Sequence, residues 1–308
     1  MQEEALSVQS GDVLLEGLIA RPENGEAEKL VLLIGGSGPL DRNQNSSSVQ
    51  LNLFSELALH LAEQGFASFR YDKRGCGEST GDYDATGHSD LVADACACLE
   101  HLKNHDDFSS ADIYVLGHSE GTLIAPQVVA KIPGIAGQIL VMPYLEKFTS
   151  LIRRQAEQSL KEIKKVPGFR GMMIRFFLLI SGDQIAKQKK LIQRIQKTSE
   201  ATIKIKKQVI NAKWIREMIV LEPTEIHASV NTPTLAIAGE KDLQCDPNDI
   251  EILKEHIVGP LETHVVPDLT HILRCDPEEA STQHYAALAM EAVDVNTMRL
   301  VSDWLKRQ

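Results

Sequence analysis

Short apolar runs alternate with segments of helical spacing through the first half of the chain. Runs such as residues 30–34 are continuously apolar, as expected for strands that are buried on both faces of a sheet. The segments between them place leucines three or four residues apart, which predicts amphipathic helices. The expected strands are 13–19, 30–34, 66–71, 113–116 and 138–142, and the expected helices are 51–63, 91–102 and 122–129. Strands separated by helices imply an α/β fold with a doubly wound, mostly parallel sheet.

This alternation stops after residue 143 and resumes near residue 234. Residues 144–225 have a helical, lysine-rich pattern, and the alternation then continues with strands at 234–238 and 263–266 and helices at 250–256 and 293–306. A helical block between two strands of a sheet is best interpreted as an inserted lid. We therefore expect a core formed by residues 1–143 and 226–308, with a helical lid at 144–225. The apolar positions of the lid, which we expect to cover a pocket, are Ile152, Leu160, Met172, Met173, Phe176, Phe177, Leu179 and Trp214.

The distribution of charge also separates the expected lid from the core. Residues 147–216 contain 18 Lys and Arg but 4 Asp and Glu, a net charge of +14, whereas the remainder contains 14 and 39, a net charge of −25. We expect attraction between these two parts to hold the lid closed. The overall net charge of −11 argues against nucleic-acid binding.

The chain has no pattern that predicts export or a membrane span. Its first residues are acidic and lack the features of a signal peptide, and its longest apolar stretch, 172–180, is far shorter than the ~20 residues that cross a bilayer. The five cysteines are odd in number and contain no CxxC, which is typical of neither a disulfide framework nor a zinc site. We expect a cytoplasmic protein with reduced, buried thiols and no stable membrane insertion, while homodimer formation stays open.

One pentapeptide indicates nucleophilic catalysis. Residues 117–121, GHSEG, match G-x-S-x-G, in which the glycines permit a sharp strand-to-helix turn that exposes the serine. The match lies between the strand at 113–116 and the helix at 122–129, the placement that this turn requires. Ser119 is therefore the candidate nucleophile. The second position of the motif normally points into the fold, so we expect His118 to be packed rather than catalytic.

Two further segments carry a resemblance to the α/β-hydrolase superfamily. Residues 36–43, GSGPLDRN, resemble the G-S-G-P-x-D-R-[DN] loop of a group of bacterial carboxylesterases, and residues 71–79, YDKRGCGES, resemble the superfamily's [YD]-x-R-G-x-G-x-S turn. Gly35 departs from the pattern, because many relatives carry histidine there. The resemblance covers nearly the whole chain and implies an α/β-hydrolase fold with serine hydrolase activity.

The superfamily's catalytic residues follow the order Ser, then Asp or Glu, then His. The resemblance therefore implies an acid after the strand at 234–238, where Asp242 fits best and Asp246 and Glu240 compete. It implies a histidine beyond the last strand, which selects His271 over His264.

Acyl transfer also requires donors for the negative charge that develops on the substrate oxygen. The N–H of Glu120, which follows the nucleophile, should be one of them. The resemblance points to the N–H of Ser37 as the second. Asp41, Arg42 and Arg74 are interpreted as structural, ion-paired residues of their loops rather than as substrate ligands.

The predicted activity is hydrolysis of carboxylic esters of small to medium acyl groups. Ser119 attacks, His271 transfers the proton, Asp242 holds the imidazole, and water releases the acid. The same triad could cleave thioesters or small peptides and amides, and a non-enzymatic ligand-binding protein of this fold is the alternative from another class. We expect a small-molecule acyl ester as partner, no cofactor, and no metal site, since the histidines are scattered.

Overall fold

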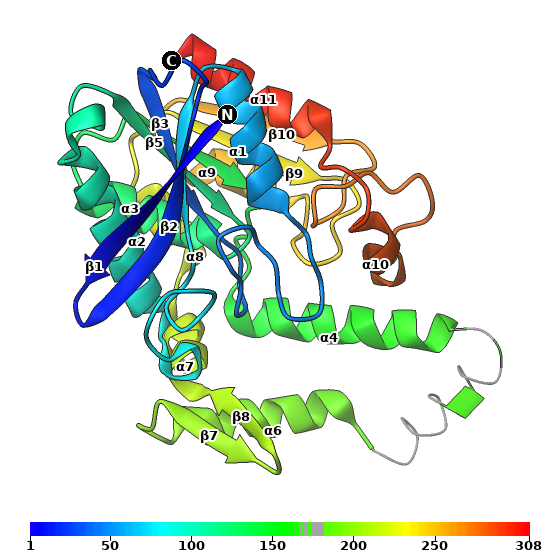
Figure 1. Cartoon of the computed structure of the whole chain (residues 1–308). Helices are drawn as coiled ribbons and strands as arrows, with labels where there is room; N and C mark the ends of the chain where they lie inside the picture. Colours follow the sequence, from blue (N-terminus) through cyan, green and yellow to red (C-terminus); the bar gives the residue numbers. More distant parts are fainter. Residues whose placement is uncertain (167, 169–171, 174–181) are drawn as a thin grey trace.

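The computed structural model describes the chain except residues 167, 169–171 and 174–181. Its centre is an eight-stranded sheet in the order β1-β2-β4-β3-β5-β6-β9-β10 (Figure 1). Neighbouring strands from β4 to β10 are parallel, whereas β1 with β2 and β2 with β4 are antiparallel, so the prediction of a mostly parallel sheet is confirmed. The strands are β1 (Gln2–Ser10), β2 (Val13–Arg21), β3 (Lys29–Ile34), β4 (Ala67–Tyr71), β5 (Asp112–His118), β6 (Gly137–Val141), β9 (Thr234–Gly239) and β10 (Leu261–Val266).

Strand β1 is the sheet element that the hydrophobic pattern does not predict. It is an edge strand whose first half is exposed, so it has no continuous apolar run. It forms because it pairs with β2 along its whole length through a two-residue turn, in which Gly11 adopts φ of 58°.

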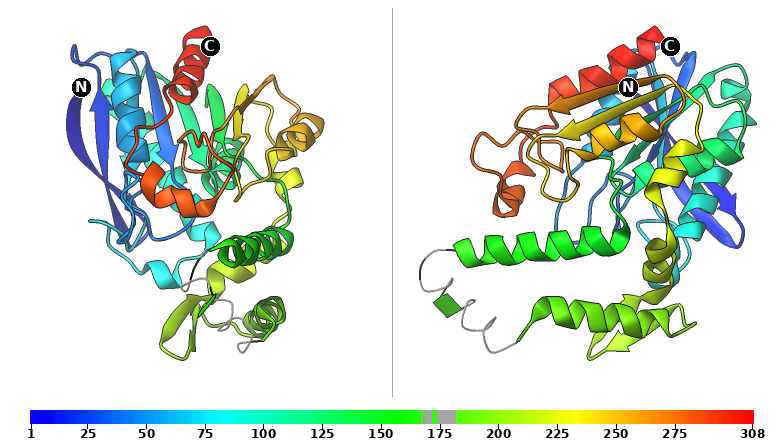
Figure 2. Two further views of the ribbon diagram at one scale, coloured as in Figure 1. Left: turned by 90° about the vertical axis from the view of Figure 1, so that its right-hand side faces the viewer. Right: turned by 180° about the vertical axis from the view of Figure 1, so that it is seen from behind.

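Helices cover both faces of the sheet, as the views from the side and from behind show (Figure 2). In β3, Leu30, Leu32 and Ile34 pack toward one face, whereas Val31 and Leu33 pack toward the other. The first face is covered by α2 (His88–Lys103), α3 (Gly121–Lys131) and α9 (Asp249–His256), and the second by α1 (Leu53–Glu63) and α11 (Val295–Arg307). Burial on both faces explains why the central strands are continuously apolar. These helices lie within about one turn of their predicted positions.

Between β6 and β9, which are neighbours in the sheet, the chain makes a long excursion that we call the insertion (residues 144–225). Its elements are α4 (Phe148–Lys165), α6 (Gln184–Gln196), β7 (Thr202–Ile205), β8 (Gln208–Asn211) and α7 (Ala212–Val220), and α8 (Pro223–Ala228) begins within it and ends beyond it. The expectation of a purely helical segment was wrong, because β7 and β8 form an antiparallel hairpin. The alternation of β-branched and polar residues in β7, Thr-Ile-Lys-Ile, favours a strand.

The apolar residues expected in the insertion behave in different ways. Ile152 and Trp214 pack against the core, whereas Met172 and Met173 are each 52% exposed. Phe176, Phe177 and Leu179 lie outside the described residues.

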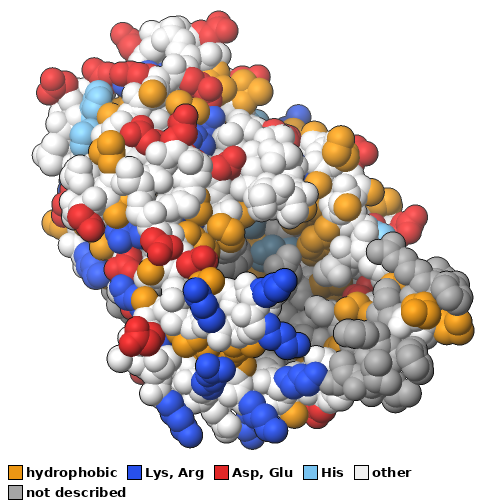
Figure 3. Space-filling view, turned by 60° about the horizontal axis from the view of Figure 1, so that its bottom comes forward, with side chains coloured by type: hydrophobic (Ala, Val, Ile, Leu, Met, Phe, Trp, Pro, Cys, Tyr) orange, Lys and Arg blue, Asp and Glu red, His pale blue; other side chains and the backbone are white. Residues whose placement is uncertain are grey.

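Helix α7 attaches the insertion to the body of the protein. The Asn211 side chain donates to the carbonyls of Tyr83 and Thr86, and the Glu217 carboxylate accepts the backbone N–H of Ser89 at 2.7 Å. Lys213 pairs with Asp90 at 2.5 Å. This last contact is an ion pair between the insertion and the body. Figure 3 shows Lys and Arg side chains gathered on this side of the molecule, beside a hollow with a histidine at its floor.

The remaining short elements are the 3₁₀ turns Tyr83–Ala85, Asp106–Phe108 and Thr282–His284 and the helix α10 (Tyr285–Leu288). All five cysteines are free, but the expectation of buried thiols fails at Cys275, which is exposed. None of the described helices has the length and apolar character needed to span a membrane.

Candidate active site

The candidate nucleophile lies on a sharp turn between β5 and α3. Ser119 has φ of 55°, in the left-handed region that residues other than glycine seldom adopt. A Cβ atom at Gly117 would collide with the carbonyl of Gly121, and one at Gly121 would collide with the carbonyl of Ile34. Both glycines of the motif are therefore required by close backbone approach, and the turn leaves Ser119 half-buried.

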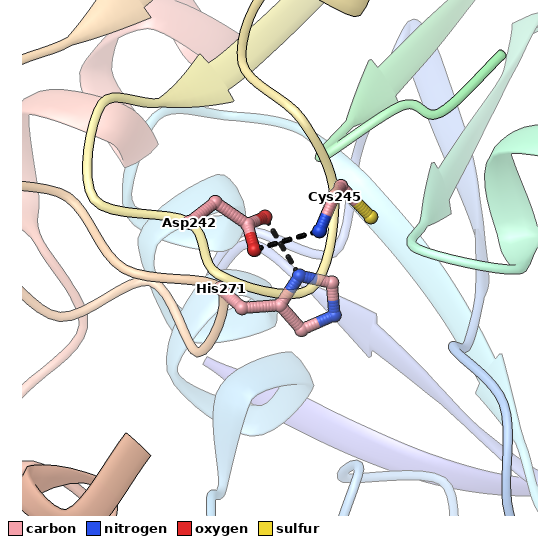
Figure 4. Close-up of side chains that lie close together, drawn as sticks. All are labelled: Asp242, Cys245 and His271. Atoms are coloured by element: carbon pink, nitrogen blue, oxygen red, sulfur yellow. Dashed lines mark hydrogen bonds and ion pairs between the residues drawn. The ribbon is translucent and has the colours of Figure 1, made fainter. Parts of the chain in front are cut away.

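Two loops from the far end of the chain bring an imidazole and a carboxylate to this serine. His271 Nε2 lies 3.1 Å from Ser119 Oγ, and His271 Nδ1 lies 2.7 Å from Asp242 Oδ2. The second oxygen of Asp242 accepts the backbone N–H groups of Gln244 and Cys245 (Figure 4). His271 and Asp242 are both buried. A nucleophile, a base and an orienting acid are thus joined in one hydrogen-bonded series.

The alternative candidates for the acid and for the base make other contacts. Asp246 accepts the backbone and side-chain N–H groups of Asn248, which makes it a turn residue before α9. Glu240 accepts the N–H of Asp268. His264 lies in β10, where it contacts Glu262 at 2.8 Å.

In the described part of the chain, one group of side chains has the composition of a metal site. Asp242, Cys245 and His271 offer ligand atoms within 4.8 Å of one another. Both oxygens of Asp242 already accept hydrogen bonds (Figure 4). Burial raises the pKa of Cys245 well above its usual value, which keeps the thiol protonated. His101 and His105 have the H-x-x-x-H spacing, although the histidines were expected to be scattered. However, α2 ends at Lys103, so the two rings do not share a helical face, and their centroids lie 6.4 Å apart.

The loop after β3 lies against the nucleophile. A Cβ atom on Gly36 would lie 3.1 Å from the Cβ of Ser119, so the loop backbone passes beside the serine. In the described part of the chain, neither the N–H of Ser37 nor that of Glu120 meets an acceptor. At Gly35, the position that departs from the loop pattern, the space for a side chain is filled by Gln44, whose Oε1 accepts the N–H of Gly36 at 2.9 Å.

The charged residues of the neighbouring loops are ion-paired or hydrogen-bonded within the protein. Arg42 pairs with Asp72 and Glu78, both at 2.5 Å, and Arg74 pairs with Asp94. Asp41 accepts the backbone N–H groups of Asn43 and Asn45. These contacts support the structural interpretation of the three residues.

A buried ion pair beside the nucleophile was not foreseen. The Glu120 carboxylate lies 3.6 Å from the Lys73 ammonium, and it also accepts the indole N–H of Trp214 at 2.5 Å. Lys73 stands in the YDKRG turn and Trp214 in the insertion, so nothing in the local sequence connects them.

His118 is packed in the interior, as its motif position predicts. Its Nε2 lies 3.0 Å from the carbonyl of His271, and burial, reinforced by the neighbouring His271, lowers the pKa of His118 to about 3. The unfolded chain, in which a histidine has a pKa of about 6.5, therefore binds more protons than the folded chain between about pH 6.5 and about pH 3. His118 thus lowers the free energy of unfolding as the pH falls through this window, by up to ~1.4 kcal/mol per pH unit.

We expect the variant His118→Gln, which keeps a donor for the His271 carbonyl, to have a shallower dependence of stability on pH in this window. Urea unfolding between pH 7 and pH 4 measures it. Replacement of the partly exposed His264 serves as the control. A slope that is unchanged in His118→Gln would contradict a neutral, buried His118.

The arrangement of strands, turn and loops can be compared with known proteins. Residues 49–278 match the family described as serine aminopeptidase, S33. Esterase EstD of Thermotoga maritima is 22% identical over 313 residues, which cover 97% of this chain and 68% of that protein.

Solved structures share the fold at low sequence identity. Est1E of Butyrivibrio proteoclasticus with bound ferulic acid has a TM-score of 0.64 and 16% identity, with 99% of both chains covered. The esterase Pf2001 of Pyrococcus furiosus has a TM-score of 0.60 and 18% identity, covering 99% of this chain and 90% of that one. Proline iminopeptidase of Mycobacterium smegmatis has a TM-score of 0.61 and 16% identity, covering 99% and 98%. The family match spans most of the chain, which therefore belongs to the serine aminopeptidase, S33 family and has the α/β-hydrolase fold.

Proposed function

We propose that this protein is a serine esterase that hydrolyses carboxylic esters of small to medium acyl groups through an acyl-enzyme intermediate. The observation that carries the proposal is the hydrogen-bonded series from Ser119 Oγ through His271 to Asp242 at a strained strand-to-helix turn. Strain at such a turn is typical of a residue that must be presented to a substrate.

The residues of the site have distinct roles in this reaction. His271 Nε2 accepts the proton of Ser119 as the oxygen attacks the ester carbonyl, and returns it to the leaving alcohol. Asp242 keeps the proton of His271 on Nδ1 and stabilises the imidazolium. The N–H groups of Ser37 and Glu120 donate to the oxyanion. Water then attacks the acyl-enzyme with His271 as the base.

The relatives support ester hydrolysis, since EstD and Pf2001 are named as esterases. The family description and the similarity to a proline iminopeptidase favour a second candidate, cleavage of small peptides or amides. Thioesters are a third substrate class for the same triad. A non-enzymatic binding role is disfavoured, because such a protein has no need of the complete hydrogen-bonded series.

Matched substrates distinguish the enzymatic candidates. We expect kcat/KM for a p-nitrophenyl ester to exceed that for the thioester and the p-nitroanilide of the same acyl group. A burst of p-nitrophenol equal to the enzyme concentration would report the acyl-enzyme. Faster turnover of aminoacyl anilides than of any ester would replace the esterase proposal with the peptidase one.

The insertion provides an expectation for acyl length. Trp214 contacts both Glu120 and the ring of Phe148, 5.2 Å away, so apolar side chains of the insertion reach the nucleophile turn. We expect acyl groups of about two to six carbons to be preferred, because each CH₂ adds ~0.8 kcal/mol until the covering side chains are reached.

A chain-length series of p-nitrophenyl esters at low and high salt tests this expectation. Salt should broaden the length profile, since it screens exposed charges over about 10 Å at 0.1 M. A preference for long chains at low salt would contradict the short pocket. A profile that is indifferent to removal of the insertion would contradict its role as a lid.

A further inference from the structure

A buried ion pair connects the two segments that carry the proposed oxyanion donors. Glu120 supplies one donor through its backbone N–H, while its side chain, 2% exposed, turns into the protein. The ammonium group of Lys73, on a side chain that is 7% exposed, lies 3.6 Å from Glu120 Oε2. Burial by itself raises the pKa of Glu120, but contacts with His88, Lys73 and Trp214 hold that pKa below its usual value, so the carboxylate is charged.

The same ammonium group holds the other donor segment. Lys73 Nζ donates to the carbonyl of Gly36 and, at 3.2 Å, to the carbonyl of Gly38. These two carbonyls flank Ser37, whose N–H is the second proposed donor. One side chain therefore fixes the loop on both sides of Ser37 and is itself attracted to the residue that carries the first donor.

This geometry is suited to oxyanion stabilisation. Donors aimed at a developing charge are effective when their positions are set before the reaction, because the protein then pays no reorganisation cost during it. The attraction between two charges that are shielded from water is strong, since it is little screened. The Lys73–Glu120 pair connects the loop that carries Ser37 to the turn that carries Glu120. The separation of these two segments sets the distance between the two donor N–H groups.

A side chain of the insertion hydrogen-bonds to this pair. The Trp214 indole donates to Glu120 Oε1, the oxygen that does not face Lys73. Trp214 belongs to α7, which Asn211, Lys213 and Glu217 attach to the body. A displacement of α7 would remove a donor from a buried carboxylate, which is costly, and would leave Glu120 held by Lys73 and by His88, whose Nδ1 lies 3.6 Å from Oε1.

From these contacts we propose that Lys73 and Glu120 are positioning residues that set the separation of the two oxyanion donors, and that Trp214 makes this separation depend on the seating of the insertion. The inference rests on the proposed function. It adds a device by which the insertion controls the rate of acylation rather than substrate binding alone.

The test uses three replacements that change a side chain and leave the donor N–H groups in place: Lys73→Met, Glu120→Gln and Trp214→Phe. Stopped-flow kinetics with p-nitrophenyl acetate separate the acylation rate constant from the substrate dissociation constant. The rate of labelling of Ser119 by a fluorophosphonate is a second readout, because phosphonylation develops charge at the same donors and needs no knowledge of the natural substrate.

We expect Lys73→Met and Glu120→Gln to lower the acylation and labelling rates by about 10²–10³, the range for loss of one oxyanion donor, and Trp214→Phe by about 10-fold. The substrate dissociation constant should change by less than about 3-fold. Removing both members of a buried pair leaves no unpaired charge, so the double variant should be no slower than the slower single variant. Trp304→Phe, in the core beneath β5, is the control for loss of a buried indole, and its rates should equal those of the wild type.

Rates are expressed per labelled active site, which removes any contribution of unfolded protein. If a variant does not fold, Lys73→Arg and Glu120→Asp replace it, and both should still slow acylation because they alter the length of the connection. Unchanged rates per active site, or a change confined to substrate dissociation, would overturn the inference. A wild-type protein that is not labelled at all would instead overturn the proposed function, so the two failures are distinguishable.

Discussion

Ser119→Ala is expected to lower kcat for ester hydrolysis by about four to six orders of magnitude while the fold is retained. Ser119 Oγ is the atom that lies 3.1 Å from His271 Nε2, so its removal leaves the imidazole without a nucleophile to activate. Alanine is as compatible with the turn as serine, because the turn depends on the close approach of Gly117 and Gly121. Circular dichroism and thermal unfolding should therefore match the wild type.

A fluorophosphonate probe identifies the nucleophile directly. It should label the wild type once and leave Ser119→Ala unlabelled. Ser55→Ala, in the first turn of α1, is the control and should be labelled like the wild type. Stoichiometric labelling of a different serine in Ser119→Ala would show that the nucleophile has been assigned wrongly.

Asp242→Asn is expected to lower kcat by about 10⁴. The carboxylate accepts the Nδ1 proton of His271 at 2.7 Å, and its other oxygen is fixed by the N–H groups of Gln244 and Cys245. An amide at this place can donate to Nδ1, which favours the tautomer with its proton on Nε2, and that tautomer cannot accept the proton of Ser119.

Two matched variants separate this effect from a general loss of negative charge. Asp246→Asn and Asp268→Asn remove nearby carboxylates that make only turn hydrogen bonds or surface ion pairs. Both should retain most of the wild-type kcat. If Asp246→Asn were the inactive variant and Asp242→Asn were near wild type, the acid would have to be reassigned.

The parts of the fold that the sequence predicts are those in which one local pattern decides the structure. The central strands are buried on both faces, so residues such as Leu30 to Ile34 are all apolar. In contrast, β1 owes its existence to pairing with β2, and the hairpin of β7 and β8 lies in a lysine-rich segment where short strands have no hydrophobic run. Pairing between segments is not visible in the composition of either one.

The candidate site divides in the same way. Ser119 is marked by a turn motif, and Asp242 and His271 follow from the chain order of a recognised family. The Lys73–Glu120 contact and its link to Trp214 join three segments that are distant in the chain. Each of these residues, taken alone, has an ordinary place in a polar loop, a motif or a helix, so only the three-dimensional arrangement identifies them as a group.

The position of the insertion also affects how the protein is made. Strand β6 ends at Val141 and its neighbour β9 begins at Thr234, so the ribosome must synthesise the whole insertion before β6 can be paired on that side. At ~5–20 residues per second this delay lasts roughly 5–20 seconds. Throughout it, the edge of a strand whose five residues are all buried in the finished fold is open to wrong partners, including another nascent chain. Soluble yield during expression should therefore depend on translation speed through residues 144–225 and on chaperones that bind such an edge.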